Sequence, residues 1–387
     1  MPMRRHWTVV ICLAVVLSSA FAPAAHGELR EGDAVTLDAG RFVVTRLDAL
    51  PYVENEYTRR FRFDGHDNPK LRELRVRYGL DEVVAPGTDE FGRQVLLLDW
   101  VNRRFKKFGR PTCDATGALE ILKAIDEGHT FFCAHYAETL VSAAASLGWV
   151  CRPLALRRPD HVGEGSTEHS STEIWSNQHR RWVMFDPTFA MYAEKDGVPL
   201  NAYELRQEWF RRDGRDLVFV VGKERRRYRK DDLPVLRGRF EGFGDLTLDA
   251  SALNVYAFIG YIPNTDLMDR GKDYGGMFIT QDDLGGKTTW HKRTVPADPA
   301  NEPYFPIHQA ALTLTPDPDG KGLRVGLKTL TPNFRTFVAR IDGGEWKPVA
   351  DSFTWTLHAG DNRLEVKAVN QSGVEGPIAI AEIQVLG

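Results

Sequence analysis

The chain has 387 residues, a formal net charge of −3, 42% hydrophobic residues and 27% charged residues. This length is enough for two or three ordinary domains, each with its own apolar core. The near-neutral charge gives no case for a nucleic-acid partner, and the basic run of residues 225–230 is offset at once by Asp231 and Asp232, which favours a solvated surface.

The first 27 residues predict an export signal. Arg4 and Arg5 precede an apolar stretch from Trp7 to Leu17, and small residues follow as far as Gly27. A positive start, a short apolar core and a small-residue cleavage site are the parts of a secretory signal peptide. The apolar run is shorter than the ~20 residues that a membrane span needs. We therefore expect a secreted or periplasmic protein with no membrane span once residues 1–27 are removed.

Residues 28–84 have short, mixed patterns and are expected to form an N-terminal extension. A helical pattern follows from Asp89 to Phe108, where one apolar stripe ends before Gly109. The stripe consists of Phe91, Val95, Leu98, Val101 and Phe105. A second helix is expected from Thr116 to Ile125.

Cys133 is expected in the first turn of a third helix. After it, apolar residues recur at three- and four-residue spacing as far as Leu147, and Gly148 stands where a left-handed helix cap is usually found. In a first turn, the unpaired backbone N–H groups and the helix dipole favour a negative sulfur and lower the pKa of the thiol. The position predicts a nucleophile, although a buried structural cysteine is the commoner use of this residue type.

Residues 169–175 and 180–186 predict two short strands joined by a polar turn. If this hairpin is centred between Asn177 and Gln178, His169 lies directly opposite Asp186 on one face. Opposed β-carbons in an antiparallel pair are about 4.5–5.5 Å apart, so the carboxylate can accept the imidazole N–H. That contact would fix the tautomer of the imidazole and stabilise its charged form. The residues around them are too apolar for two unrelated polar side chains on an exposed ribbon.

Cys133, His169 and Asp186 together supply the nucleophile, the base and the orienting carboxylate of a Cys-His-Asp acyl-transfer enzyme. We expect no cofactor for this chemistry. We also expect no metal, because the histidines between residues 129 and 179 form no His-x-x-x-His pair and no Cys-x-x-Cys pair is present.

Three segments carry a resemblance to a known family. The run from Cys133 to Leu147 with the following Gly148–Pro153, then His169–Glu173, then Trp182–Thr188, resembles the three signatures of the transglutaminase-like superfamily. That superfamily includes transglutaminases, bacterial transglutaminase-like proteases and peptide:N-glycanases. The resemblance implies an α+β fold with a papain-like core within residues 85–234. It also implies Cys133 as nucleophile, His169 as general base and Asp186 as its orienter.

Two positions differ from the family pattern. Phe131 stands where the family usually has glycine, which bears on the shape of the acyl pocket, and Ser171 stands where it usually has an aromatic residue, which bears on packing over the imidazole. The backbone N–H of Cys133 is expected to form one half of the oxyanion hole.

The cysteine count fits an exported enzyme. Cys12 leaves with the signal peptide, so the mature chain keeps Cys113, Cys133 and Cys151. An odd number outside the cytoplasm is consistent with one reactive thiol and a disulfide between the other two. Three free thiols are nevertheless the main expectation, and the disulfide is the alternative.

The last third of the chain is predicted to be β-rich. Residues 235–307 combine turn signals with short aromatic strands and form an expected middle region. Residues 308–387 show short alternating segments such as Leu323–Leu327 and Arg363–Val369, which predict an antiparallel β-sandwich. Their turn sequences resemble Ig-like or fibronectin-type-III modules of secreted bacterial proteins. That resemblance implies a spacer, or a contact with a cell surface or polysaccharide.

Three functions are consistent with these features. The first is a cysteine hydrolase that cleaves amide bonds in a peptide or protein through a thioester. The second is a peptide:N-glycanase-like enzyme that acts on a glycopeptide with the same three residues. The third is a catalytically idle binding protein in which the triad is kept for packing.

Overall fold

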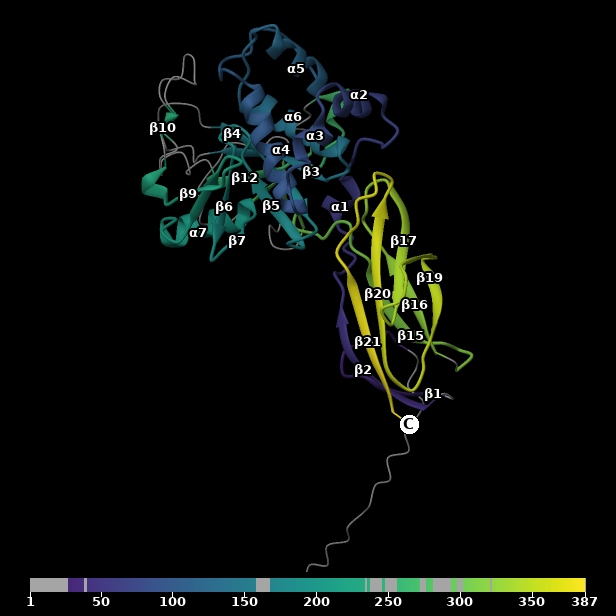
Figure 1. Ribbon diagram of the computed structural model, residues 1–387. Helices are drawn as coiled ribbons and strands as arrows, with labels where there is room; N and C mark the ends of the chain where they lie inside the picture. The colour runs from purple at the N-terminus through teal and green to yellow at the C-terminus, as the bar shows by residue number, and fades with distance from the viewer. Residues whose placement is uncertain are drawn as a thin grey trace, which may run out of the picture.

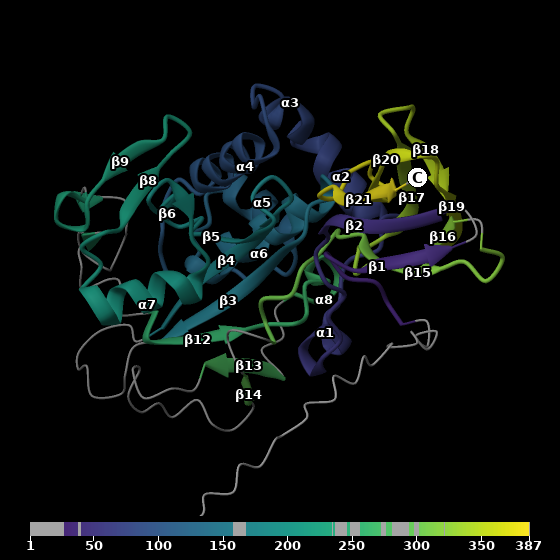
Figure 2. The same ribbon diagram turned by 90° about the horizontal axis from the view of Figure 1, so that it is seen from below.

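The computed structural model describes residues 27–37, 40–157, 168–233, 235–236, 246–247, 256–271, 276–280, 294–297, 302–320 and 322–386. All of the predicted signal peptide except Gly27, and with it Cys12, lies outside these ranges. The described residues form two lobes (Figures 1 and 2). One combines helices and sheets and is called the α+β lobe; the other is the elongated β lobe. Several antiparallel sheets beside helices confirm the expected α+β class.

Several helices of the α+β lobe pack on the helix that begins at Cys133. The bounds of the helices are α1 (Glu56–Arg60), α2 (Pro69–Arg77), α3 (Leu80–Val84), α4 (Glu90–Arg104), α5 (Ala118–Asp126), α6 (Cys133–Ser146), α7 (Ala202–Arg212) and α8 (Leu267–Arg270), with a 3₁₀ turn η1 (Lys230–Asp232). Helices α2, α4 and α5 all pack on α6. Within the described ranges, no helix is both long and apolar enough to cross a bilayer.

The predicted helices are present, with two differences: α5 begins at Ala118 and not at Thr116, and α4 ends earlier than predicted. Asp89 caps α4 by accepting the N–H of Gly92 at 2.7 Å, and the predicted apolar stripe is buried. The helix ends at Arg104 and not at Phe108, because Phe108 instead forms a parallel bridge with Phe131. After the C-terminal end of α6, Gly148 has the predicted left-handed backbone, with φ of 83°.

The central sheet has the strand order β14-β13-β12-β3-β4-β5. Its strands are β3 (Cys151–Arg157), β4 (Glu168–Ser176), β5 (Arg181–Phe185), β12 (Phe258–Tyr261), β13 (Met277–Thr280) and β14 (Thr294–Ala297). Strands β10 (Val235–Leu236) and β11 (Leu246–Thr247) pair separately. Because β12 lies directly beside β3, the predicted boundary between residues 234 and 235 cuts through this sheet, and strands β12, β13 and β14 of the predicted middle region belong to the α+β lobe.

The β4–β5 hairpin differs from its predicted register. Thr172 pairs with Phe185 and Trp175 with Trp182, so the strands are offset by two residues from the expected pairing. Arg180 adopts a left-handed backbone with φ of 53°, which extends the turn to residues 177–180. The prediction that His169 and Asp186 are directly opposed is therefore wrong. A shift of two residues nevertheless keeps both on the same face, one diagonal step apart.

A smaller sheet, β7-β6-β8-β9, adjoins α7. Its strands are β6 (Met191–Lys195), β7 (Val198–Pro199), β8 (Val218–Val221) and β9 (Arg226–Tyr228). The basic run lies on β9 and on the residues at either end of it. Arg227 pairs with Glu194 at 2.6 Å and Lys230 pairs with Asp213, as expected of a charge-balanced surface.

The β lobe is a sandwich of two sheets. Their strands are β1 (Ala34–Leu37), β2 (Gly40–Asp48), β15 (Ala311–Pro316), β16 (Gly322–Lys328), β17 (Phe334–Ile341), β18 (Lys347–Val349), β19 (Ser352–Thr356), β20 (Gly360–Asn370) and β21 (Ala379–Leu386). The larger sheet has the order β1-β2-β21-β20-β17-β18 and the smaller β15-β16-β19. Phe42 and Val44 of β2 share the core with Trp355 and Leu364.

The predicted division at residue 308 therefore needs correction. Strand β2 pairs with β21 along its length, so residues that were expected to form an N-terminal extension complete the sandwich. The later part of that predicted extension, α2 and α3, packs instead in the helical core of the α+β lobe. Alternation along a strand predicts which face is buried but not which strand is the neighbour, and this explains the error.

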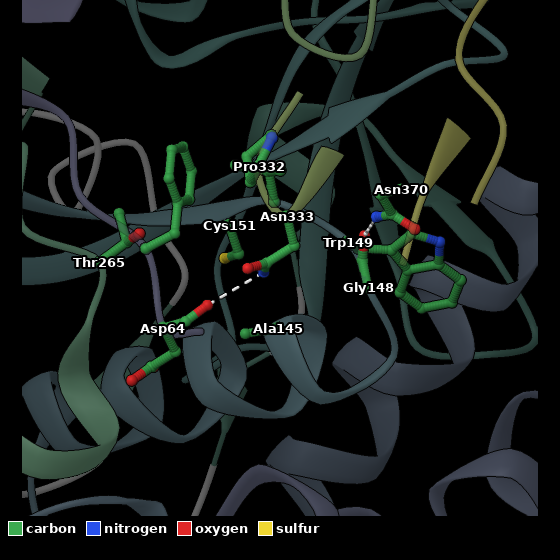
Figure 3. A pocket seen from close by; sticks show the side chains of 11 residues that line it. Asp64, Ala145, Gly148, Trp149, Cys151, Thr265, Pro332, Asn333 and Asn370 are labelled. Carbon is green, nitrogen blue, oxygen red and sulfur yellow. Dashed lines mark hydrogen bonds between the residues drawn. The ribbon is translucent and has the colours of Figure 1, made fainter. Parts of the chain in front are cut away.

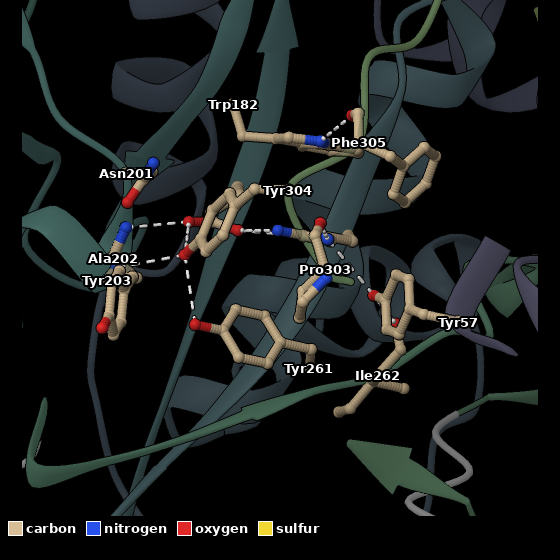
Figure 4. A network of polar contacts seen from close by, with 12 residues as sticks. Tyr57, Trp182, Asn201, Ala202, Tyr203, Tyr261, Ile262, Pro303, Tyr304 and Phe305 are labelled. Carbon is tan, nitrogen blue, oxygen red and sulfur yellow. Dashed lines mark hydrogen bonds and ion pairs between the residues drawn. The ribbon is translucent and has the colours of Figure 1, made fainter. Parts of the chain in front are cut away.

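A buried charge pair fixes the segment before the β lobe to the central sheet. Arg152 of β3 and Glu173 of β4 face each other with no solvent exposure, and their side chains meet at 2.6 Å. Figure 4 shows the ring of partners around them: Glu173 accepts from the N–H of Ala202 at 2.8 Å and from the Tyr304 hydroxyl at 2.9 Å. Arg152 also donates to the carbonyl of Pro303. Such full pairing offsets the cost of burying both charges.

The two lobes meet at the C-terminal end of α6. Asn370 donates to the Gly148 carbonyl at 2.8 Å, and Asn333 donates to the Asp64 carbonyl at 3.1 Å (Figure 3). These residues line a cavity of about 20 Å³, room for about one water molecule. Burial raises the pKa of the Asp64 carboxyl to about 6.

Candidate active site

The Cys133 sulfur lies at the N-terminal end of α6. The N-cap residue, Phe132, has no side chain that can accept the first N–H groups of the helix. The thiol hydrogen-bonds with His169, and the backbone of Ser170 also hydrogen-bonds to it. Cys133 is half-buried, so it is shielded but still reachable from solvent.

His169 is held between Cys133 and Asp186. Its Nε2 lies 2.7 Å from Oδ2 of Asp186, and its side chain is 13% exposed while that of Asp186 is 1% exposed. Because Nε2 faces the carboxylate, Nδ1 is the ring nitrogen left for the sulfur. The structure therefore brings together all three residues that the sequence singled out, through a diagonal contact of the two strands.

Electrostatics at the site favour a thiolate beside a charged imidazole. Burial alone would raise the pKa of Cys133, but the charge and hydrogen bond of His169 and the backbone of Ser170 outweigh it, so the pKa is lowered. Burial alone would lower the pKa of His169, but Asp186 and the sulfur raise it to about 10. Both shifts favour the thiolate–imidazolium pair over the neutral thiol and imidazole.

A tight turn after Asp186 completes the site. The backbones of Asp186 and Met191 exchange two hydrogen bonds of 2.8 and 3.1 Å, which closes a turn over residues 187–190. Within it, the Thr188 N–H donates to Asp186 Oδ1 at 3.0 Å, and the Phe189 ring lies 5.6 Å from the His169 ring. Ala190 has a left-handed backbone with φ of 52°. The turn thus fixes the second carboxylate oxygen and covers the imidazole.

Phe131 and Ser171, the two positions at which the sequence departs from the pattern it resembles, are both buried. Phe131 is fully buried and its ring lies 4.7 Å from that of His135 in the first turn of α6. Ser171 is also buried, and its hydroxyl donates to the Phe185 carbonyl at 3.0 Å. The aromatic ring beside the imidazole is that of Phe189, with ring centroids 5.6 Å apart.

The other two cysteines are free thiols, so the expected alternative of a Cys113–Cys151 disulfide is wrong. Burial raises the pKa of both, and in the case of Cys113 the charges of Asp114 and Glu127 add to the effect. The pKa of each of these two thiols is therefore shifted in the opposite direction from that of Cys133. In the part of the chain that the structure describes, no three His, Cys, Asp or Glu side chains are grouped to hold a metal ion.

Several residues of the site were not found from the sequence. They are the Ser170 and Thr188 backbones, Phe189, and Asn102 of α4, whose amide contacts the turn after Asp186. Asn102 gave a usable signal: it follows Leu98 by four residues and precedes Phe105 by three, so it falls on the buried stripe of its helix. A polar residue on such a stripe needs a specific partner.

Comparisons with known proteins add little to this geometry. No family model matches the chain. No curated protein matches it either. Among solved structures, it is similar to a "Putative Cysteine Protease" from Cytophaga hutchinsonii, with 11% identity and a TM-score of 0.26. The match covers 38% of this chain and 48% of that protein, so the chain spans about half the length of that protein. A likeness this distant carries no argument about function.

Proposed function

We propose that the chain is an exported hydrolase that cleaves amide bonds with Cys133, His169 and Asp186 as a catalytic triad. One observation carries the proposal: His169 contacts Asp186 at 2.7 Å and also hydrogen-bonds with Cys133 at a helix N-terminus. A nucleophile, a base and a group that orients the base are thereby linked in one chain of contacts. Three polar residues kept only for packing would not require a thiol with a lowered pKa.

The proposed reaction has two halves. The Cys133 thiolate attacks the amide carbon, and the carbonyl oxygen becomes an oxyanion near the N–H groups at the start of α6. The C–N bond then breaks, the leaving nitrogen takes the proton from Nδ1 of His169, and the acyl group remains as a thioester. Next, Nδ1 accepts a proton from water, the hydroxide attacks the thioester carbon, and the C–S bond breaks to restore the thiolate. Asp186 stabilises the imidazolium whenever the ring is protonated.

The substrate is proposed to be a peptide or protein outside the cytoplasm, because the predicted signal peptide directs the chain there. The β lobe fits a spacer or a surface-contact role. Both statements rest on sequence patterns and on the resemblance to the transglutaminase-like superfamily.

The test is a thiol-reactivity profile followed by a substrate panel. Cys133 should react with iodoacetamide at pH 6, well below the usual thiol pKa near 8.5, while Cys113 and Cys151 stay largely unmodified. Peptide and glycopeptide libraries incubated with the wild type should show new termini or released glycan that are absent with Cys133→Ala. An inert Cys133 in the folded protein, or full activity in Cys133→Ala, would refute the proposal.

A further inference from the structure

The turn that follows Asp186 depends on a side chain from a distant helix. Asn102 is on α4, packed beside α6, and is only 4% exposed. Its amide nitrogen donates to the Pro187 carbonyl at 3.0 Å and to the Thr188 carbonyl at 2.7 Å. Both N–H bonds of one buried amide are therefore used on two successive carbonyls of a single turn.

These two carbonyls belong to the peptide units that control the site. The unit between Pro187 and Thr188 carries the N–H that donates to Asp186 Oδ1 at 3.0 Å. The next unit carries the N–H of Phe189, whose ring packs on His169. Because a peptide unit is planar, holding its carbonyl also fixes the direction of its N–H.

The turn also contains one unfavourable backbone conformation, at Ala190, which contacts from neighbouring segments must stabilise. Ala190 is left-handed with φ of 52°, a conformation that is unfavourable for a residue with a β-carbon. In addition to the Asp186–Met191 bridge, the N–H of Gly222 donates to the Ala190 carbonyl at 2.8 Å. Without Asn102, two buried carbonyls would lose their partners on one side of this strained turn.

We infer that Asn102 is a positioning residue, which holds the turn after Asp186 and, through it, the His169–Asp186 pair in the arrangement that the Cys133 thiolate requires. Asn102 does not contact the reacting atoms; it acts through Asp186 and Phe189. This inference rests on the proposed function, since it assigns Asn102 to the same triad.

Gln94 of the same helix provides a matched control. It is fully buried, and its amide donates to the Trp175 carbonyl of β4 at 3.0 Å, at the opposite end of that strand from His169. Gln94→Ala and Asn102→Ala each remove a buried amide from α4 that bonds backbone carbonyls. Only Asn102→Ala releases the turn beside the triad.

The experiment measures the rate of iodoacetamide modification of Cys133 against pH in the full-length protein, with melting temperature recorded in parallel. We expect both variants to melt earlier. Asn102→Ala should slow Cys133 modification at pH 6 by at least about threefold, since half a pKa unit changes the thiolate fraction by that factor. Gln94→Ala should leave the pH profile unchanged. In an Asp186→Asn background, Asn102→Ala should slow the modification by a smaller factor than in the wild type, because part of its effect passes through Asp186.

The outcomes separate this inference from the proposed function. A wild-type Cys133 that is inert at pH 6 refutes the proposed function itself. A reactive wild type with an unchanged profile in Asn102→Ala, or an equal shift in Gln94→Ala, refutes only the role of Asn102. If Asn102→Ala does not fold, Asn102→Ser keeps one donor and should give an intermediate shift; a wild-type profile in that variant also overturns the inference.

Discussion

The chemistry of Cys133 is decided by the charge that faces it. All three cysteines of the described chain are shielded to some degree, and burial taken alone would raise the pKa of each thiol. At Cys133 alone, a charged imidazole and the start of a helix oppose this effect. Because the imidazole owes its charge largely to Asp186, the carboxylate is the remote determinant of the thiolate.

Replacing Asp186 with Asn tests this dependence with almost no change in volume. The amide still accepts the imidazole N–H but no longer supplies the negative charge that raises the pKa of His169. That pKa should fall, the ion pair with Cys133 should weaken, and the pKa of the thiol should rise. We expect iodoacetamide modification of Cys133 at pH 6 to slow at least about tenfold, as one pKa unit implies.

The control for Asp186→Asn is Asp99→Asn. Asp99 is another buried carboxylate, on α4, where it pairs with Arg103 at 2.7 Å and lies outside the triad. This variant should lose stability without a change in the pH profile of Cys133. Equal slowing in both variants would show that general loosening of the fold, and not the Asp186 charge, explains the effect.

Local elements could be predicted from the sequence because their signals are local. The α4 stripe and the Gly148 cap follow from helical period and from the freedom of glycine at positive φ. The grouping of Cys133, His169 and Asp186 could be predicted because the three short motifs that carry them lie on such elements. The hairpin register could not, since it depends on the left-handed backbone of Arg180, a residue type that carries no turn signal. Asn102 was missed because its partners are backbone carbonyls in a distant turn.

We expect Gly148, at the end of α6, to be needed both for its left-handed backbone and for the close contact of the two lobes. With φ of 83°, any side chain is strained there, and a β-carbon would lie 2.4 Å from that of Ser372 in the β lobe. Gly148→Ala should therefore reduce the free energy of unfolding by about 2–4 kcal/mol, from the left-handed penalty plus overpacking. Urea denaturation of the full chain measures this loss.

Gly128, after α5, separates the two contributions. It is also left-handed, with φ of 97°, but a β-carbon there meets nothing within 4 Å. Gly128→Ala should cost only about 1–2 kcal/mol. In the Gly148→Ala background, Ser372→Gly should recover part of the lost stability. Ser372 also contacts His66 at 3.0 Å, so the Ser372→Gly variant must be measured alone as well, to complete the double-mutant cycle. Equal costs at both glycines would rule out the contact with the β lobe as a cause.

At the scale of the whole molecule, the chain passes between the two cores at His308. Ile307 lies in a core of the α+β lobe and Ala310 in the core of the β lobe, while His308 between them is 1% exposed and left-handed. Neither ring nitrogen has a hydrogen-bond partner among the described residues. Burial lowers the pKa of His308 to about 4, so the ring is neutral in the folded protein at neutral pH.

This histidine should make the protein sensitive to acid. The unfolded chain binds a proton near pH 6.5 and the folded chain only near pH 4, so stability is full above pH 6.5 and falls as the pH drops through that window. The shift corresponds to about 3 kcal/mol. Asp64 has a raised pKa, so its contribution to stability increases as the pH falls. The effect of His308 must therefore be measured as the difference between the wild type and a His308 variant. His308→Asn tolerates the left-handed backbone and should flatten the decline in unfolding free energy between pH 6.5 and 4.5.

His358→Asn serves as the control for His308→Asn. Its side chain is 58% exposed, and the Ala359 carbonyl and Asp342 raise its pKa. The decline between pH 6.5 and 4.5 should keep its wild-type slope in this variant. An unchanged slope in His308→Asn would show that the buried ring does not control acid stability.

Strands β1 and β2, from the N-terminal part of the chain, complete the larger sheet of the β lobe. Strand β2 pairs with β21 from Arg41 opposite Leu386 to Asp48 opposite Ile380, and Phe42 and Val44 are buried in the shared core. A fragment of residues 308–387 would expose this edge and part of this core to water. It should be unfolded, or should self-associate through the open edge, when examined by circular dichroism and sedimentation.

Restoring the missing strands should restore the fold. A permuted fragment, in which residues 308–386 are followed by a flexible linker and residues 28–49, contains both sheets and the whole core of the β lobe. We expect it to be monomeric and to unfold cooperatively, because every strand that the full chain pairs in these two sheets is present. A control with Phe42→Asp and Val44→Asp in the permuted fragment should behave like residues 308–387 alone. A stable, monomeric fragment 308–387 would instead show that β1 and β2 only cover a sandwich that is already complete.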